Sequence, residues 1–337
     1  MAADPLTETL TIEAATALIT QALEAAGTPT PAAGSVARAL VAAEAEGQVG
    51  HGFSRLADYA AQVQSGKVRA DATPICHQDG PGALHVDAGD GFAYPALELA
   101  IDRVCAAARI QGCAMVSITR SHHCGALSIQ VEKIAQVGLI GIMMANAPPA
   151  IAPWGAHQPV FGTNPIAFAA PRRAAPPLVI DLSLSRVARG KVMHAKKSGS
   201  SIPEGWALDA AGQPTTDPEA ALAGSMVPIG EAKGSALALM VEILVASLAG
   251  ANPSRKVASF FAAEGPPCGA GQFLMALRPL EGFAARVESL LAHIASLDGA
   301  RLPGARRADA LAGARVQGLC VPRHYLDAAR ALAAPLD

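Results

Sequence analysis

A histidine and an arginine four residues apart, His51 and Arg55, are the first candidates for chemistry, in the stretch EGQVGHGFSRLADY. A histidine can transfer a proton near neutral pH, and an arginine fork can bind a carboxylate through two bonds. If this stretch is helical, both side chains project from one face, with Gly50 and Gly52 leaving space around the imidazole. The pair then suits a small acid whose neighbouring atom gains or loses a proton. The alternative is a solvent-facing His51 and an Arg55 paired with Asp58.

Adjacent histidines precede a cysteine in RSHHCG, residues 120–125, directly after a predicted strand. Consecutive residues rarely converge on one metal ion, and the sequence has no HxxxH or CxxC partner, so we predict no metal site. The loop leads into a predicted amphipathic helix over residues 125–138. The first N–H groups of such a helix could hold phosphate oxygens.

Three further groups could contact an anionic ligand. Asp181 ends a predicted strand and could cap a helix or hold a ribose hydroxyl. Lys233 begins an apolar helix, where the helix dipole favours acids, and a bound anion would explain it. Arg301, Arg306 and Arg307 surround the Pro-Gly turn of RLPGARR and suit a phosphate monoester, or else form a solvated basic loop.

Composition limits the class of protein. The 337 residues are 51% hydrophobic and 16% charged, which allows a large core, and the net charge of −2 with no basic run argues against nucleic acid as the main partner. No targeting segment and no membrane-spanning run of apolar residues is evident, so we expect no membrane association. The six cysteines have no regular spacing, which indicates a cytoplasmic protein with reduced thiols.

The elements that would position these residues alternate after a helical start. Apolar spacing predicts helices over 12–27, with Thr11 as N-cap, over 31–47, and from His51 to Gly66. Strands are predicted over 112–120, 139–146, 166–171 and 177–184, with a long loop over 147–165. A cationic helix follows from about Arg186, then an irregular polar segment, a buried helix from Lys233 and two C-terminal helices. The absence of GxGxxG and GxxxxGK[ST] argues against an ordinary Rossmann domain.

The motifs and their order resemble the malate/L-lactate dehydrogenase-2 family of NAD(P)-dependent oxidoreductases. The matching segments, spanning about residues 40–310, are HGFSRLADYAAQVQSGKV, SHHCGALSIQVEKIAQVGLIGIMMANAPPAIAPWG, FGTNPIAFAAP, VIDLSLSRVARGKV, IPEGWALDAAGQPTTDPEAAL and KGSALALMVEIL. The resemblance implies an α/β fold with a mixed-sheet, non-Rossmann NAD(P)-binding domain, residues 116–284. A largely helical substrate and dimerisation domain, residues 1–115 plus 285–337, would lie beside it in a homodimer.

Within this family, three features are similar to the Δ1-piperideine-2-carboxylate/Δ1-pyrroline-2-carboxylate reductases: the double histidine, the KGSAL helix start and the RLPGARR loop. The resemblance therefore implies NADPH-dependent reduction of a cyclic imino acid to pipecolate or proline, with NADH as a possible cofactor. The first alternative is a 2-hydroxy-acid dehydrogenase of the malate or lactate type. A second is a poorly active nucleotide-binding paralogue.

The resemblance also implies residue roles. His51 would give a proton to the imine nitrogen, and Arg55 would hold the substrate carboxylate. Thr163, Arg189 and Gly190 would line the substrate pocket. The cofactor-binding residues would be His123, Cys124, Gly125, Ala126, Leu127, Asp181, Leu182, Ser183, Ala232, Lys233, Arg301, Leu302, Pro303, Gly304, Ala305, Arg306 and Arg307.

Two positions depart from the imine-reductase pattern. Gly50 stands where the family usually has a serine that orients the histidine, and Lys191 stands where an acidic partner is expected. Many hydroxy-acid members also carry lysine at the second position. The proton relay of the imine reductases is therefore incomplete in this sequence. A water, or less readily Ser54, could replace the missing hydroxyl.

Overall fold

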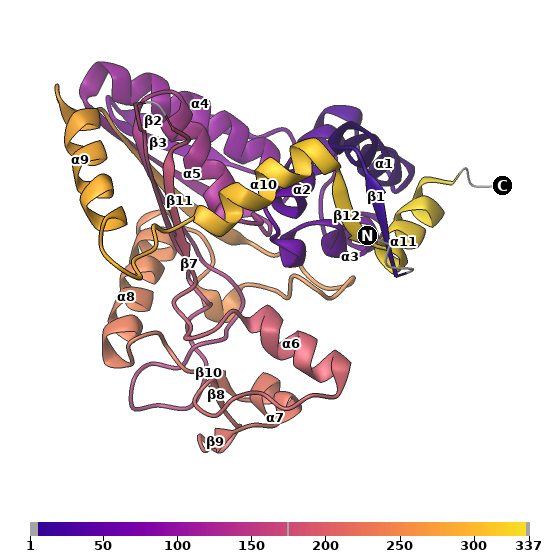
Figure 1. Cartoon of the computed structure of the whole chain (residues 1–337). Coiled ribbons are helices and arrows are strands. Elements are labelled where there is room, and N and C mark those ends of the chain that lie inside the picture. The colour runs from indigo at the N-terminus through magenta and orange to yellow at the C-terminus, as the bar shows by residue number, and fades with distance from the viewer. Residues whose placement is uncertain (1–5, 174, 335–337) are drawn as a thin grey trace.

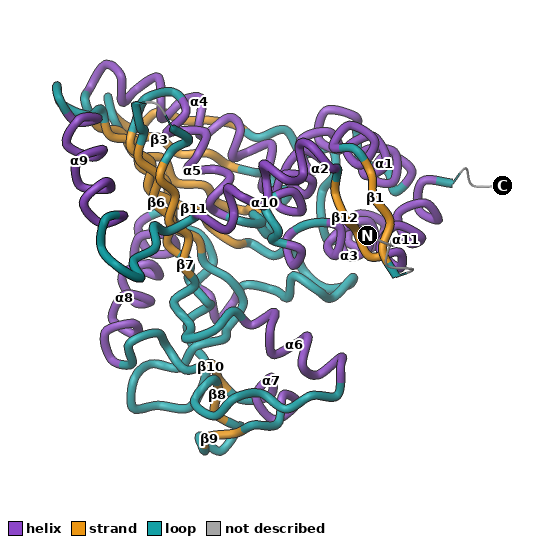
Figure 2. Tube along the Cα trace, in the orientation of Figure 1, coloured by secondary structure: helices purple, strands orange, loops and turns teal. Residues whose placement is uncertain are grey.

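A seven-stranded mixed sheet forms the centre of the computed structural model, which describes residues 6–173 and 175–334 (Figure 1, Figure 2). The strand order is β2-β3-β4-β11-β5-β6-β7. β3 and β4 are parallel, and every other neighbouring pair is antiparallel. The strands are β2 Ile75–Gly80, β3 Ala83–Asp87, β4 Cys113–Ser121, β5 Ile140–Ala145, β6 Ile166–Ala170, β7 Leu178–Leu182 and β11 Ala270–Leu277.

The four strands predicted between residues 112 and 184 are confirmed as β4, β5, β6 and β7. β4 and β5 are nevertheless not neighbours, because β11 lies between them and pairs antiparallel with both. Leu274 of β11 is aligned with Val116 on one side and with Met143 on the other. The strand that joins the two halves of the sheet thus comes from far along the chain.

Both faces of the sheet are covered, as the alternation of side chains along a strand requires. Met143 and Leu274 pack in the core beneath α4, Ala93–Gln111, and α5, Leu127–Gln136. The neighbouring Met144 and Phe273 point to the other face. There they pack in a second core with α8, Ala232–Glu242, and the π-helix Ile243–Leu248 that continues it.

A helical layer lies beside one end of the sheet and contains both ends of the described chain (Figure 1). Its helices are α1 Ile12–Ala25, α2 Thr30–Ala45, α3 Leu56–Gln64 and α11 Arg323–Ala333. β1, Thr7–Leu10, pairs antiparallel with β12, Leu319–Pro322. Thr11 caps α1 as predicted, because its hydroxyl accepts the N–H of Ala14 at 3.1 Å.

The segment between β7 and α8 is a small substructure below the sheet in Figure 1. It contains α6 Arg189–Ser198, α7 Pro218–Ala223 and a sheet of order β10-β8-β9. These short strands are β8 Ala207–Leu208, β9 Pro214–Thr215 and β10 Ser225–Met226. The predicted irregular segment therefore has regular structure, and its buried residues join the core beneath α8.

The prediction that the helix from Lys233 is buried is wrong on one side. Leu237, Met240, Ile243 and Leu248 are between 38% and 56% exposed, whereas Ala238 and Val241 are fully buried. A helix that is apolar all round gives no sequence signal for which side the rest of the chain covers. α8 and the π-helix thus present an apolar face to solvent.

The two predicted C-terminal helices are confirmed as α9, Phe283–Ala295, and α10, Ala305–Gln317. The predicted domain boundary between residues 115 and 116 falls inside β4, and β2 and β3 join the same sheet as the later strands. The division into two domains stays a prediction. The six cysteines are free thiols. Within the described residues, no helix combines the length and apolar character needed to cross a membrane.

Candidate active site

Two successive 3-10 turns, Val49–His51 and Phe53–Arg55, carry the candidate catalytic pair. The predicted α-helix starting at His51 is therefore wrong, since α3 begins only after these turns. Gly52 separates the turns with φ −102° and ψ −133°, far from helical values. The glycine-flanked histidine therefore lies in the connection between α2 and α3, and not within an α-helix.

Glu44 of α2 supports this break. Its Oε2 accepts the N–H of Phe53 at 2.9 Å, and a Cβ on residue 52 would stand 2.0 Å from the same oxygen. Glycine at position 52 therefore lets the carboxyl group reach the backbone between His51 and Arg55. The other oxygen of Glu44 is enclosed without a hydrogen-bond partner among the described residues, and burial raises the pKa of Glu44 to about 7.

The imidazole of His51 has one enclosed and unpaired nitrogen. Nδ1 has no hydrogen-bond partner among the residues the structure describes, and the ring stacks on that of His123. Burial and the charge of Arg55 lower the pKa of His51 to about 4, so the ring is neutral at pH 7. A Cβ on Gly50 would meet nothing within 4 Å, and Gly50 has no positive φ. A serine would therefore fit there.

Ser54 does not replace the missing hydroxyl, because its Oγ donates to the carbonyl of Val49 at 2.6 Å. Lys191 lies exposed in the first turn of α6. Neither residue orients His51 as the serine and the acidic residue of the imine reductases are expected to do. The incomplete relay predicted from the sequence is thus consistent with the unpaired Nδ1.

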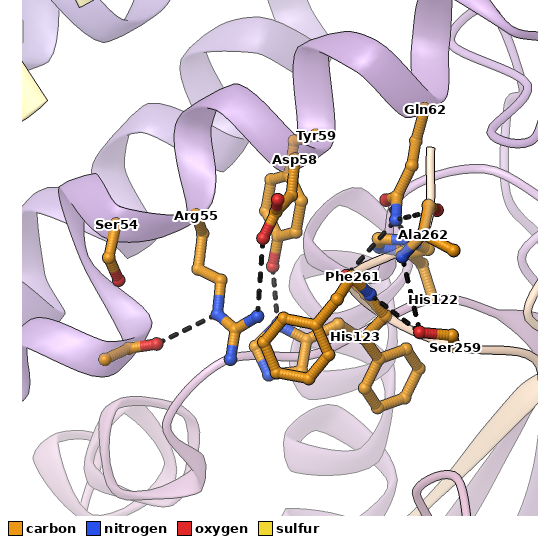
Figure 3. A network of polar contacts seen from close by, with 12 residues as sticks. Ser54, Arg55, Asp58, Tyr59, Gln62, His122, His123, Ser259, Phe261 and Ala262 are labelled. Carbon is orange, nitrogen blue, oxygen red and sulfur yellow. Dashed lines mark hydrogen bonds and ion pairs between the residues drawn. The ribbon is translucent and has the colours of Figure 1, made fainter. Parts of the chain in front are cut away.

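Arg55 is held in place but keeps one N–H for a ligand. Its Nε donates to the carbonyl of Gly50 at 2.9 Å, and the guanidinium carbon lies 4.3 Å from the ring centroid of Phe261 (Figure 3). Nη1 is 3.7 Å from Asp58, a long ion pair, and is enclosed without a hydrogen-bond partner among the described residues. Nη2 has no hydrogen-bond partner among the described residues and is not one of the enclosed atoms, so it is the group that a carboxylate ligand could reach.

His123 is hydrogen-bonded to Tyr59, which in turn contacts Tyr94, and neither tyrosine was predicted from the sequence. Its Nδ1 lies 2.6 Å from the hydroxyl of Tyr59, which lies 3.1 Å from the hydroxyl of Tyr94. His122 instead bonds through Nε2 to Gln62 at 2.9 Å. Tyr59 is eight positions after His51 in the sequence, and only the fold shows that it reaches the SHHC loop.

A second feature missed from the sequence is the loop over residues 257–269, between the 3-10 turn Ser254–Lys256 and β11. Its backbone carbonyls accept hydrogen bonds from three side chains at the end of α3 and just beyond it. These are Gln62 to Phe260 and Ala262, Ser65 to Ala263, and Lys67 to Ser259 and Ala262. The loop places the ring of Phe260 against His123 and that of Phe261 over Arg55.

Glu242 connects the start of this loop to the predicted substrate-contacting segment FGTNP. Its Oε2 accepts from Asn164 Nδ2 at 3.0 Å and from the hydroxyl of Ser254 at 2.7 Å, and all three residues are buried. Asn164 has φ +39°, a left-handed conformation that asparagine tolerates. This buried network fixes the backbone next to Thr163.

The start of α5 is capped by a carboxylate from β7. Asp181 Oδ2 accepts the N–H of Ser128 at 2.8 Å, although burial raises the pKa of Asp181. The carboxylate therefore occupies the position predicted for phosphate oxygens. The preceding loop, residues 123–127, is buried, and burial raises the pKa of Cys124 to about 12, so this thiol stays protonated.

The predicted arginine loop leads into α10 beside β7, since a Cβ on Gly304 would lie 2.8 Å from the carbonyl of Val179. Arg307 does not project freely: Nη1 lies 2.7 Å from Glu46 Oε1 and 2.8 Å from Glu132 Oε2. Arg301 and Arg306 are exposed. Only these two arginines remain open to an external phosphate.

The other predicted site residues lie at the end of β7 and just after it, and at the starts of α6 and α8. Arg189 donates to the carbonyl of Pro149 at 2.8 Å, and the Ser183 hydroxyl lies 2.6 Å from that of Ser185. Leu182, Gly190, Ala232 and Lys233 are exposed. Their contacts with substrate or cofactor stay predictions.

Comparison with known proteins identifies the class. The malate/L-lactate dehydrogenase family model matches residues 10–328, and the chain belongs to this family of oxidoreductases. It is 48% identical to the (2R)-3-sulfolactate dehydrogenase (NADP(+)) of Chromohalobacter salexigens, over 96% of this chain and 98% of that protein. It is 39% identical to the Δ1-pyrroline-2-carboxylate/Δ1-piperideine-2-carboxylate reductase of Pseudomonas aeruginosa, over 86% of this chain and 88% of the relative.

Solved structures show the same fold. The crystal structure of Δ1-piperideine-2-carboxylate reductase from Pseudomonas syringae matches with a TM-score of 0.92 and 36% identity, over 97% of this chain and 100% of that one. The sulfolactate dehydrogenase of Methanocaldococcus jannaschii matches with a TM-score of 0.88 and 27% identity, over 96% of each chain. The predicted family, fold class and enzyme class are confirmed, whereas the relatives include both substrate branches.

Proposed function

We propose that this protein is an NADP-dependent dehydrogenase of a small 2-hydroxy acid that carries a second anionic group, such as 3-sulfolactate. The observation that carries the proposal is the neutral imidazole of His51 beside the unpaired N–H of Arg55. Oxidation of a hydroxyl group needs a base, and a neutral imidazole is one. Reduction of an imine and reduction of a keto acid both need the protonated ring, so the lowered pKa of His51 favours the oxidative direction.

The residues divide the work as follows. Arg55 binds the substrate carboxylate through Nη2, while Phe261 and the carbonyl of Gly50 hold the guanidinium in place. His51 accepts the hydroxyl proton as the carbonyl forms at C2. When bound, NADP+ would supply the hydride acceptor for C2. In the reverse direction His51 returns the proton to the oxygen.

The second anionic group is supported by the 48% identity to a 3-sulfolactate enzyme. Lys191 adds to this support, because the imine-reductase pattern has an acid at this position. A cation here suits a substrate with two negative charges better than a cyclic imino acid. Gly50 points in the same direction, since the serine of the imine-reductase relay is absent.

The donor set fits NADP. Arg301 is exposed on the loop beside β7 and Arg306 in the first turn of α10, and two guanidinium groups suit the 2′-phosphate. We do not assign Arg307 to this role, because it forms ion pairs with Glu46 and Glu132. The relative at 48% identity is named as NADP(+)-dependent, which supports the same choice here.

We propose a homodimer on the basis of the exposed apolar side chains of α8 and the π-helix. Exposed apolar patches commonly mark protein–protein contacts. The cytoplasmic location stays a prediction.

A second candidate is reduction of a cyclic imino acid with NADPH, the activity predicted from the sequence. The match to a piperideine-2-carboxylate reductase structure at a TM-score of 0.92 favours it. The same His51 and Arg55 would serve, provided that substrate binding raises the proton affinity of the imidazole.

Assays of several substrates, with NADPH absorbance as the readout, distinguish the two candidate functions. Oxidation is measured with NADP+ and (2R)-3-sulfolactate, malate or lactate, and reduction with NADPH and each cyclic imine. We expect kcat/KM for sulfolactate to exceed that for lactate by about 10²-fold, since an unfilled anion site strongly disfavours the smaller acid. His51→Gln is the inactive control. Turnover of the imines alone would overturn the proposal, and nucleotide binding without any turnover would indicate the poorly active paralogue.

A further inference from the structure

We propose that His123 is a second catalytic residue, whose Nε2–H donates a hydrogen bond to the reacting oxygen of the substrate. Tyr59 and Tyr94 are its positioning residues, because they fix which nitrogen of the imidazole carries the proton. The role rests on the proposed function for the identity of the reacting oxygen. The tautomer itself does not depend on any substrate.

The contacts form a short buried chain. The Tyr94 hydroxyl lies 3.1 Å from the Tyr59 hydroxyl, which lies 2.6 Å from His123 Nδ1. Tyr59 is 0% exposed and Tyr94 is 3% exposed. Water therefore cannot readily replace either partner, and the two phenol protons must find acceptors within this chain.

Only one direction of donation satisfies both phenols. If Tyr94 donates to Tyr59 and Tyr59 donates to His123 Nδ1, each O–H group has an acceptor. If His123 Nδ1–H donates instead, Tyr59 must donate to Tyr94, and the Tyr94 proton has no acceptor among the described residues. An enclosed donor without a partner is energetically costly. The first arrangement is favoured, and it leaves the imidazole hydrogen on Nε2.

Charged forms do not disturb this assignment. Burial raises the pKa of Tyr59 and of Tyr94 well above the usual range, so both phenols stay protonated. Burial and the charge of Arg55 lower the pKa of His123 well below its usual range. The ring is therefore neutral and has a single proton to place.

The free edge of His123 lies in the candidate active site. Its ring stacks on that of His51, and Figure 3 shows it between Tyr59 and the guanidinium of Arg55, behind Phe261. Nε2 has no hydrogen-bond partner among the described residues, yet it is not one of the enclosed unpaired atoms. A substrate bound by Arg55 therefore faces the imidazoles of both His51, which accepts a proton, and His123, which donates a hydrogen bond.

The two histidines would act on the same oxygen in different ways. In the oxidative direction the hydroxyl proton passes to His51, and bound NADP+ would supply the acceptor for the hydride of C2. His123 keeps its proton throughout and donates a hydrogen bond to the oxygen as it gains negative character. Removal of one such fixed donor typically lowers kcat by about 10²- to 10³-fold.

The tautomer is tested first, by long-range 15N–1H spectra of the labelled imidazoles in the unliganded protein, with His123 assigned from His123→Gln. We expect the Nε2–H tautomer in the wild type and in Tyr94→Phe, which keeps the Tyr59 hydroxyl. Tyr59→Phe should keep this tautomer as the major form, since a free imidazole also favours it, but should lose the Nδ1 chemical shift of a hydrogen-bonded nitrogen. A wild-type Nδ1–H pattern, or an Nδ1 chemical shift that is unchanged in Tyr59→Phe, would overturn the proposal.

Kinetics test the role. Glutamine can place an amide N–H near the position of Nε2, whereas leucine has none, so His123→Leu should lose about 10²-fold in kcat and His123→Gln less than about tenfold. NADPH affinity, measured by fluorescence, should change by a similar factor in both variants, because each removes the imidazole. Equal kcat values in both variants, or loss of NADPH binding in place of kcat, would contradict a donor role. If the substrate panel fails, the spectra still report the tautomer.

Discussion

The imidazole rings of His51 and His123 lie 5.3 Å apart and within 16° of parallel, one from the turn after α2 and one from the loop after β4. Their Nδ1 atoms differ: that of His123 bonds to Tyr59, whereas that of His51 is enclosed and unpaired. A ring with a fixed partner keeps one tautomer. A ring without one can exchange its proton, which suits a general base.

The unpaired nitrogen of His51 predicts a gain from Gly50→Ser. The serine side chain meets no steric obstacle and would restore a hydroxyl next to the imidazole. We expect kcat to rise by about tenfold or more, within the range of general acid–base effects. Gly50→Ala is the matched control, because it adds the Cβ without the hydroxyl. Equal rates in the two variants would show that the hydroxyl does not act on His51.

Arg55 should determine substrate binding more than the rate. Arg55→Lys keeps the charge but removes the planar fork, so we expect KM for the hydroxy acid to rise by about 10²-fold. Phe261→Leu removes the ring over the guanidinium, a contact of about 0.5–2 kcal/mol, and should raise KM by about three- to tenfold. Steady-state kinetics measure both. A fall in kcat at unchanged KM would place the two residues outside carboxylate binding.

The raised pKa of Glu44 predicts that the free energy of unfolding depends on pH. Burial raises its pKa from 4.5 to about 7, so between these values the folded state holds a proton that the unfolded state has lost. The stability of the wild type therefore falls as pH rises through this window. Glu44→Gln does not titrate, so its stability relative to wild type should increase by up to about 3 kcal/mol between pH 4.5 and 7.

Urea unfolding of both proteins at the two ends of this window measures the difference. The pKa values of His51 and His122 are lowered, so the stability that these two histidines contribute is lost as pH falls below about 6.5. This pH dependence is opposite in sign to that of Glu44. Both proteins carry these histidines, and their contribution cancels in the comparison. A difference that stays constant with pH would mean that Glu44 is ionised throughout.

Arg307 should contribute to stability and not to cofactor choice. Arg307→Leu leaves Glu46 and Glu132 as neighbouring unpaired carboxylates, and we expect a loss of about 3–5 kcal/mol in the free energy of unfolding. Arg306→Leu is the control and should change stability by less than about 0.5 kcal/mol, as exposed positions usually do. Arg306→Leu should instead weaken the preference for NADPH over NADH. The reverse pattern would assign the 2′-phosphate to Arg307.

Local patterns in the sequence were sufficient for much of the fold. Thr11 marks the start of α1, and short apolar runs mark β4 to β7. The insertion of β11 between β4 and β5 is not visible in any local pattern, because apolar periodicity gives no information about which strands pair. The exposed face of α8 escaped prediction for a related reason, since its sequence is apolar on every side.

The candidate site was only partly predictable. Residue type identified His51 and Arg55, and the two flanking glycines were expected to leave space around the imidazole. In the structure Gly52 separates two 3-10 turns and makes room for the carboxyl group of Glu44. By residue type alone, Tyr59 and Phe261 cannot be told from ordinary core or surface residues. Their importance follows from distances to His123 and Arg55, which only the folded chain provides.

The central place of β11 has a consequence for biosynthesis. β4 and β5 leave the ribosome well before residues 270–277, yet both need β11 as a partner. Until then the nascent chain has two unpaired strand edges in its apolar core, and such edges favour association with other chains. We therefore expect fragments that stop before β11 to aggregate, and completion of the sheet to wait until translation is nearly finished.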